Sequence, residues 1–352
     1  MKKFCALCIF LTALCVLLSS CTDNPPRRVT PAFYHWQTAL DLSDFEKNYL
    51  QAVGADKLYV KFFDVDRAGD FAAPQAILQI KNEVPPTVRI IPVIFITNRT
   101  FQHLNAPQIK ELATKTVRKI RALYAGFAPR QPEEIQFDCD WSESTRVAYF
   151  SFLKAVKAEL ADVPVRLSAT IRLHQIKYRE RTGVPPVGRG MLMFYNTGKV
   201  TDPATENSIL DLKTAGLYTD RLAEYPLALD LVLPLFRWGV LFREGKMIRL
   251  LNNLTETEMQ DTTYFTHTDA RRFAVRKNTY LAGHYVYKKD TIRLERVRPE
   301  LLRKTADLLA PIFPAEDFSL AFYHIDSMLT REYAPTLLQE VNETFGRADT
   351  LR

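Results

Sequence analysis

Two aspartates and a serine alternate along one apolar stretch of the chain. Residues 135–142 read Ile-Gln-Phe-Asp-Cys-Asp-Trp-Ser, and successive side chains of a strand point to opposite faces. A strand at this place puts Asp138, Asp140 and Ser142 on one face. Two carboxylates on the inner face of a strand are costly to bury unless they are paired, hydrogen-bonded or bound to something. We therefore predict that they line a functional cavity.

Eight strand-like segments recur along the chain and supply the elements that would hold this cavity. We expect strands at residues 32–36, 57–63, 88–96, 134–140, 165–171, 190–195, 227–233 and 320–325. Helical patterns lie at residues 43–51, 106–124, 144–160 and 206–215. Continuous apolar runs such as residues 90–96 are typical of parallel strands buried on both faces. The pattern predicts an α/β fold, a closed (β/α)8 TIM-type barrel over residues 31–352, with a doubly wound open sheet as the alternative.

Residues 239–318 interrupt this alternation of strands and helices. Strand-like stretches at residues 246–251, 280–287 and 291–297 precede a helical pattern at residues 299–309. We interpret the segment as a small α+β insertion after the seventh strand, or as that insertion together with the seventh helix.

Sites in such a barrel form at the carboxyl ends of the strands, where the loops begin. Polar and aromatic residues occupy all eight predicted exits: His35, Trp36, Asp64, Asp66, Asn98, Asp138, Asp140, Arg172, His174, Tyr195, Asn196, Arg237, Trp238, His324 and Asp326. Aromatic faces can stack on sugar rings while acids and amides bond the hydroxyls, so this ring favours a glycan. The residues that we expect to bind substrate are His35, Trp36, Asp64, Asn98, Tyr195, Asn196, Trp238 and His324.

Other ligands are less favoured by the sequence. The chain has 12 glycines and no glycine-rich phosphate loop. It also has no HExxH motif and no Cys/His ligand spacing, so we expect neither a cofactor nor a metal. Cys139 lies on the strand face opposite the aspartates, and we predict a small buried core residue rather than a nucleophile.

Three short motifs resemble glycoside hydrolase family 18, the chitinase-like (β/α)8 barrels. That family ends its fourth strand with D-x-x-D-x-D-x-E, and this chain has D-C-D-W-S at residues 138–142. The family's sixth-strand pattern M-x-Y-D-x-x-G is similar to M-F-Y-N-T-G at residues 193–198, and its seventh-strand L-P-x-Y-G is loosely similar to L-P-L-F at residues 233–236. Many members also carry a small α+β insertion after the seventh strand. The resemblance implies a barrel that binds glycans containing N-acetylhexosamine.

The departures from the family pattern bear on catalysis. By the resemblance, Asp140 and Tyr195 hold the positions that support the substrate's N-acetyl group, whereas Ser142 stands where the family has its glutamate acid. Loss of a positioned acid typically removes about 10²- to 10⁴-fold in rate. The first aspartate of the motif is replaced by Ile135. Glu143 could supply the acid if the chain turns at Ser142.

An ordinary two-carboxylate hydrolysis stays open as well. Another acid from a neighbouring strand, namely Asp64, Asp66 or Asp326, could pair with Asp138 or Asp140. Our catalytic candidates from the sequence are therefore Asp138, Asp140 and Glu143.

The first twenty residues have the pattern of an export signal, with two lysines before an apolar run. The segment L-S-S-C at residues 18–21 is similar to a bacterial lipobox, which implies cleavage after residue 20 and acylation of Cys21. Residues 21–30 would form a short tether, and no later segment is apolar enough to span a membrane. We therefore expect a lipid-anchored protein of the cell envelope, at the outer membrane, whose body lies outside the cytoplasm.

Positive charge is concentrated in residues 237–304, which hold 15 lysines and arginines against 8 acids. Outside the cytoplasm, such a segment suggests an anionic glycan, lipid headgroups or an acidic partner before nucleic acid. Three hypotheses follow from the sequence. The first is a glycan-binding barrel without efficient hydrolysis; the second is an active glycoside hydrolase with a relocated acid. The third is a structural or interaction lipoprotein that docks an acidic partner through the basic segment.

Overall fold

The computed structural model describes residues 27–68, 71–314 and 316–347. The expected export signal, Cys21 and the first part of the tether lie outside these residues. Within the described part of the chain, no helix is long and apolar enough to cross a membrane.

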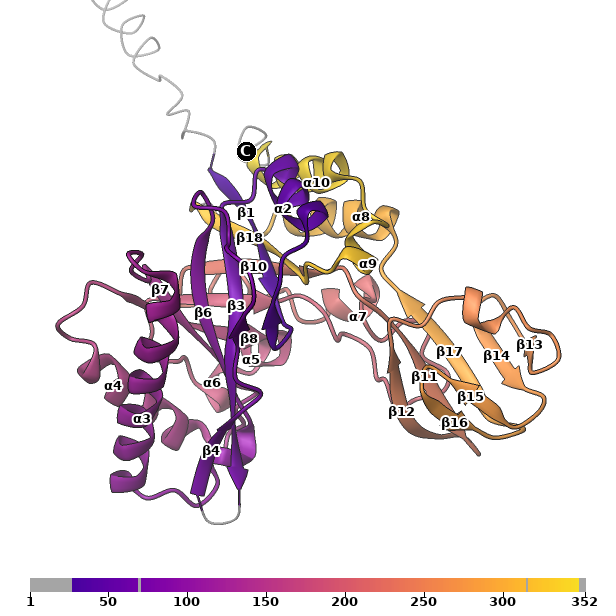
Figure 1. Cartoon of the computed structure of the whole chain (residues 1–352), viewed down its shortest axis with the longest axis horizontal. Helices are drawn as coiled ribbons and strands as arrows, with labels where there is room; N and C mark the ends of the chain where they lie inside the picture. The colour runs from indigo at the N-terminus through magenta and orange to yellow at the C-terminus, as the bar shows by residue number, and fades with distance from the viewer. Residues whose placement is uncertain (1–26, 69–70, 315, 348–352) are drawn as a thin grey trace, which may run out of the picture.

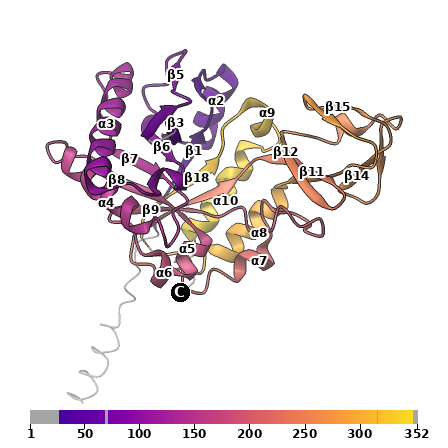
Figure 2. The ribbon, with the colours of Figure 1, turned by 90° about the horizontal axis from the view of Figure 1, so that it is seen from below.

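Eight parallel strands close into a barrel (Figures 1 and 2). They are β1 (Val29–His35), β3 (Lys57–Ala68), β6 (Arg89–Ile96), β7 (Glu134–Asp138), β8 (Arg166–Arg172), β9 (Arg189–Met193), β10 (Leu229–Pro234) and β18 (Phe318–Tyr323). Their spatial order is β1-β18-β10-β9-β8-β7-β6-β3, and β3 pairs back with β1. This closure confirms the predicted (β/α)8 barrel and excludes the open sheet.

The longer helices surround the barrel. They are α2 (Asp44–Val53), α3 (Ala106–Tyr124), α4 (Arg146–Glu159), α8 (Pro299–Leu309) and α10 (Pro335–Arg347). In Figure 1, α3 and α4 lie side by side, and α8 contacts α10. Capping boxes begin α2 at Ser43 with Glu46, and α3 at Asn105 with Gln108. Residues close in sequence therefore determine where these two helices begin.

Shorter elements fill the connections. They are α5 (Leu173–Lys177), α6 (Arg179–Thr182), α7 (Leu212–Gly216), α9 (Ser327–Thr330), the 3₁₀ helices η1 (Asn98–Phe101), η2 (Ala125–Phe127) and η3 (Thr257–Met259), and the strands β2 (Ala39–Leu40), β4 (Phe71–Gln75) and β5 (Gln79–Ile80). Strand β4 pairs antiparallel with the end of β3, and β2 pairs with β5.

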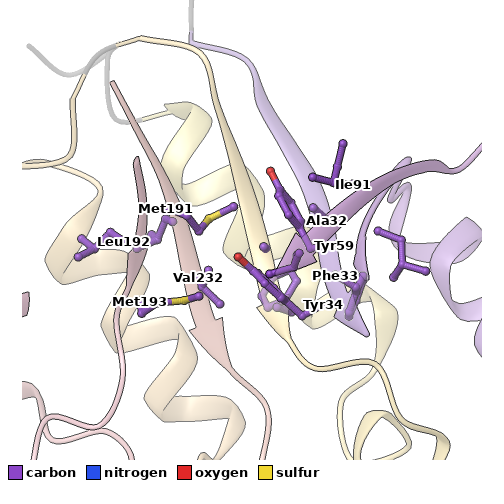
Figure 3. Packing of buried hydrophobic residues seen from close by; sticks show 14 of the residues in the cluster. Ala32, Phe33, Tyr34, Tyr59, Ile91, Met191, Leu192, Met193 and Val232 are labelled. Carbon is purple, nitrogen blue, oxygen red and sulfur yellow. The ribbon is translucent and has the colours of Figure 1, made fainter. Parts of the chain in front are cut away.

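The barrel core is packed with large side chains, as Figure 3 shows around Tyr34, Tyr59 and Met193. The rings of Tyr34 and Tyr59 stack with centroids 4.9 Å apart, and both side chains are fully buried. The Tyr34 hydroxyl donates to Gln136 of β7. Because the interior is filled, the barrel itself leaves room for a ligand above its strand ends rather than inside it.

A second, antiparallel sheet projects from the barrel after β10 (Figure 1). It is built from β11 (Arg237–Arg243), β12 (Lys246–Asn252), β13 (Phe265–His267), β14 (Arg272–Val275) and β17 (Thr291–Arg296), beside the hairpin of β15 (Thr279–Leu281) and β16 (His284–Val286). This inserted sheet has its own core around Phe273, Val286 and Ile292. Leu302 and Leu309 of α8 instead belong to the barrel core, so α8 is the barrel's helix after the insertion.

Two expected elements differ in the structure. The helix expected at residues 206–215 is reduced to α7, because Asn207 and Ser208 bond to the inserted sheet and Asp211 caps α7. The single strand expected at residues 280–287 is the β15–β16 hairpin. Its turn places Ala282 and Gly283 at φ of 47° and 76°, the backbone that a tight two-residue hairpin requires.

Candidate functional site

A cavity of about 530 Å³ opens at the carboxyl ends of the barrel strands. Its walls are Trp36, Gln37, Lys61, Asp64, Phe95, Asp138, Arg172, Tyr195, Asn196, Phe236, Arg237, Trp238, Asn252, Asn253, Tyr323, His324 and Asp326. We call it the carboxyl-end cavity. The inserted sheet contributes one wall, because Trp238 belongs to β11 and Asn252 to β12.

Asp138, at the end of β7, is the most buried acid of the cavity, with 3% of its surface exposed. Thr170 donates its hydroxyl to Asp138 Oδ1 at 2.6 Å. Arg172 Nη2 donates to the same oxygen at 3.3 Å, and Arg172 Nε donates to Asp140. One guanidinium therefore joins the two aspartates that the sequence singled out.

Burial is the main influence on the acid–base behaviour of this group. It raises the pKa of Asp138, and the nearby charge of Asp140 acts in the same direction, while Arg172 opposes both. Burial also raises the pKa of Tyr195 to about 12, against the opposing charge of Arg172. Tyr195 thus keeps its proton at neutral pH, and its hydroxyl donates to Met193 Sδ at 3.4 Å.

Aromatic rings form a continuous wall above the aspartates. Tyr323 contacts Trp36 and Tyr195, each with ring centroids 5.5 Å apart. Phe236 contacts Trp238 at 5.1 Å and Tyr195 at 5.7 Å. Such a wall, next to hydrogen-bonding groups, suits the flat apolar faces and the hydroxyls of a sugar.

A second buried charge also lines the cavity. Lys61 of β3 is 8% exposed, and its Nζ lies 3.1 Å from Asp64 Oδ1. The same ammonium lies 5.6 Å from the ring centre of Trp36, which is a cation–π distance.

The loop after β9 brings Asn196 beside Tyr195. Asn196 has a φ of 56°, a left-handed conformation that asparagine adopts more readily than most residues. Its backbone N–H donates to Ile209 O at 2.7 Å. The turn therefore directs the chain from the strand into the loop within one residue.

Seven of the eleven catalytic and substrate-binding candidates from the sequence line the carboxyl-end cavity together: Trp36, Asp64, Asp138, Tyr195, Asn196, Trp238 and His324. Asp140 lies beyond the end of β7 and is exposed, although it still contacts Arg172. His35 is buried and does not line the cavity.

Asn98, Ser142 and Glu143 lie outside the carboxyl-end cavity. The Ser142 hydroxyl lies 2.9 Å from that of Ser144 and 3.2 Å from that of Thr145, and Thr145 donates to Asn98. Glu143 is exposed and pairs with Arg181 of α6 at 3.0 Å. The turn after Trp141 therefore carries Glu143 away from the cavity rather than into it.

Trp141 and Cys139 explain this path. Both are buried, Trp141 stacks on Tyr149 of α4 with centroids 5.3 Å apart, and its Nε1 donates to Thr182 O at 2.8 Å. Burial raises the pKa of the Cys139 thiol well above its usual value, which makes a thiolate nucleophile unfavourable.

Sequence reasoning missed Lys61, Phe236 and Tyr323 as cavity residues. A lysine in the apolar run of residues 58–63 was a usable signal, because a cation there must find a buried partner. Among the described residues, no group of three or more His, Cys, Asp or Glu side chains is placed to hold a metal ion.

Comparisons with solved structures match this fold. The spore cortex-lytic enzyme SleL of Bacillus cereus aligns with 91% of this chain and 75% of its own at 13% identity and a TM-score of 0.54. A chitinase of Chromobacterium violaceum covers 91% of this chain and 99% of its own at 12% identity and a TM-score of 0.52. The family 18 chitinase ChiB of Flavobacterium johnsoniae covers 91% and 94% at 11% identity and a TM-score of 0.51. No protein-family model and no curated protein sequence matches the chain. The fold is therefore that of the chitinase-like barrels.

Proposed function

We propose that this protein binds a glycan containing N-acetylhexosamine in the carboxyl-end cavity and does not hydrolyse it efficiently. The chitinase-like fold and the aromatic wall of the cavity support glycan binding. Its volume of about 530 Å³ lies within the usual range of small-molecule sites. Tyr195 and Trp238 would stack on or bond the sugar, and Asp138 would accept its hydrogen bonds through the free oxygen.

One observation supports the absence of efficient hydrolysis: each carboxylate of the cavity already has a hydrogen-bond or ion-pair partner. Asp138 is held by Arg172 and Thr170, and Asp64 is held by Lys61. Asp326 caps α9 and accepts from Gln37 at 2.8 Å. A general acid must hold a proton and deliver it to the leaving oxygen, whereas each of these carboxylates already accepts hydrogen bonds from neighbouring groups or pairs with a cation.

An active glycoside hydrolase is the alternative. The raised pKa of Asp138 favours it, because a buried aspartic acid that keeps its proton could act as the acid. The partner carboxylate would then be Asp64 or another rim acid, since Glu143 points away. A second alternative is a structural or interaction lipoprotein that docks an acidic partner through residues 237–304.

We also propose that Cys21 carries the lipid anchor in the cell envelope. Five residues would separate Cys21 from Arg27, which is buried and donates to Phe345 O and Phe313 O, a reach of roughly 20 Å when extended. The amino ends of the strands would then face the membrane, and the carboxyl-end cavity would open away from it.

Binding of N-acetylglucosamine oligomers by isothermal titration calorimetry tests the glycan proposal. We expect the protein without its first twenty residues to bind these oligomers measurably and to release no hydrolysis product on prolonged incubation. Trp238→Ala removes a stacking face worth about 1 kcal/mol or more, so affinity should fall about tenfold. Tyr280→Ala is the matched control, because Tyr280 is 73% exposed on β15 and outside the cavity.

Two outcomes separate the hypotheses. Turnover that disappears in Asp138→Asn would establish the hydrolase and remove the binding-only proposal. If neither Trp238→Ala nor Tyr280→Ala changes the affinity, the glycan binds outside the carboxyl-end cavity.

A further inference from the structure

A second cleft lies where the inserted sheet meets α8. It has a volume of about 230 Å³, and we call it the junction cleft. Leu254, Leu294 and Leu301 contribute its apolar lining, from the segment after β12, from β17 and from α8. It is separate from the carboxyl-end cavity, and the two share only Arg237 among their lining residues.

Four exposed cations surround the junction cleft: Arg271, Arg296, Arg298 and Lys304. Arg271 lies 4.0 Å from Glu206, and Arg296 lies 3.8 Å from Glu256. Exposed ion pairs at such distances contribute little to the stability of the fold. The basic character of residues 237–304 is thus gathered, in part, around one concave surface.

Arg298 and Lys304 have no hydrogen-bond or ion-pair partner for their side chains within residues 27–68, 71–314 and 316–347. The fifth cation of the cleft, Arg237, is buried and already pairs with Glu332. Two exposed cations therefore line the cleft without an ion-pair partner among the described residues, while the acids that line it are Glu256, Glu300 and the buried Glu295, which pairs with Arg293.

Arg298 is also an unusual residue for the start of a helix. It is the N-cap residue of α8 and makes no side-chain capping bond, although serine, threonine, aspartate and asparagine are preferred there. A cation at this end of a helix is also disfavoured by the helix dipole. Departures from local preference of this kind concentrate at functional sites.

From the exposed cations around an apolar floor, we propose that the junction cleft binds an anionic sugar-sized molecule. Its phosphate or carboxylate group pairs with Arg298 and Lys304, and its body packs on the leucines. The cleft's volume of about 230 Å³ lies below the usual range of small-molecule sites, which favours a ligand of one sugar unit. This inference does not depend on what the carboxyl-end cavity binds.

The experiment is isothermal titration calorimetry at low salt. The protein without its first twenty residues is titrated separately with glucose 6-phosphate, glucuronate and glucose. We expect at least one of the two anionic probes to bind and glucose not to bind, and the two anionic probes identify which group is preferred. In the double variant Arg298→Ala with Lys304→Ala, affinity should fall at least tenfold, since a charged hydrogen bond contributes about 1.5–3 kcal/mol. Glu300→Gln should tighten binding severalfold, because the rim loses a negative charge.

The matched control is Lys246→Ala with Lys277→Ala, which removes the same charge from exposed positions of the insertion outside the cleft. This control should bind as the unmodified protein does. Equal weakening in both double variants would mean attraction to net charge alone and would overturn the proposal. So would the absence of binding by both anionic probes, or a Glu300→Gln variant that binds no tighter. Thermal unfolding of each variant establishes that it is folded.

Discussion

At the scale of single residues, Arg172 compensates the charge of the two aspartates at the end of β7. Its side chain is 19% exposed and contacts both Asp138 and Asp140, and its guanidinium lies 5.9 Å from the ring centre of Tyr195. Asp138 is almost fully buried, so without this cation its negative charge would lie in a medium that solvates it poorly. The pair is therefore a structural requirement as well as part of the site.

Arg172→Gln should lower the free energy of unfolding by about 3–5 kcal/mol, because it leaves Asp138 buried without its partner. The double variant Asp138→Asn with Arg172→Gln should recover a large part of this loss, since it removes both charges. Urea unfolding of the two single variants and the double variant gives the coupling energy.

Arg181→Gln serves as the control for this cycle. Arg181 pairs with Glu143 on the surface, where both side chains are exposed, so we expect a loss of less than about 1 kcal/mol. Strictly additive effects of Asp138→Asn and Arg172→Gln would show that the two residues do not interact.

At the scale of elements, a buried ion pair joins the inserted sheet to the loop after β9. Glu295 of β17 is 2% exposed and accepts from Arg293 Nε at 2.6 Å, Ser208 N at 2.9 Å and Trp238 Nε1 at 2.8 Å. Arg293 in turn donates to Asp202 O and Val200 O at 2.6 and 3.0 Å. The indole of Trp238 is thus positioned by the same carboxylate that holds the loop.

Glu295→Gln should loosen Trp238 and weaken glycan binding by about tenfold, because a neutral amide cannot compensate the buried Arg293 or accept all its former bonds. In protein labelled with 5-fluorotryptophan, the ¹⁹F signal that Trp238→Phe removes should shift and broaden. The signal of the buried Trp141 should stay unchanged.

Glu244→Gln is the matched control, since Glu244 is exposed in the turn between β11 and β12 of the same sheet. A Trp238 signal that is identical in Glu295→Gln and in the control would contradict the positioning role, whatever happens to glycan binding.

At the scale of the whole molecule, the barrel closes where β1 pairs with both β18 and β3. His35 ends β1, and His324 follows β18. Burial lowers the pKa of His35 to about 4, and the charge of His324 acts in the same direction, against Glu46 and Asp326. Burial lowers the pKa of His324 too, so the folded barrel keeps both rings neutral at its closure.

The unfolded chain takes up a proton on each histidine as the pH falls below about 6.5, whereas folded His35 does not until about pH 4. Stability should therefore fall on acidification through this window. Between about pH 6.5 and pH 5, urea unfolding should show a loss that is about 1.5 kcal/mol larger in the unmodified protein than in His35→Asn. Equal losses in the two proteins would mean that His35 is not held neutral by the fold.

The sequence by itself determined the barrel and many of the residues that line its carboxyl-end cavity. The alternation of apolar strands with helices predicted the eight strands, and α3 and α8 begin and end where their periodicity indicated. Trp36, Asp138, Tyr195 and Trp238 were predicted from their places at the ends of the expected strands. The prediction was possible because the carboxyl ends of all strands in a parallel barrel face the same side.

Only the tertiary structure decided which of these groups act together. Asp138 and Arg172 are 34 residues apart, and Trp238 and Glu295 are 57 residues apart, so no local pattern pairs them. Likewise, Glu143 turns outward because Trp141 is buried against α4. The junction cleft exists only because α8 packs on the barrel beside the inserted sheet. Local sequence sets periodicity and capping, but charge compensation and cavity shape arise from contacts between distant segments.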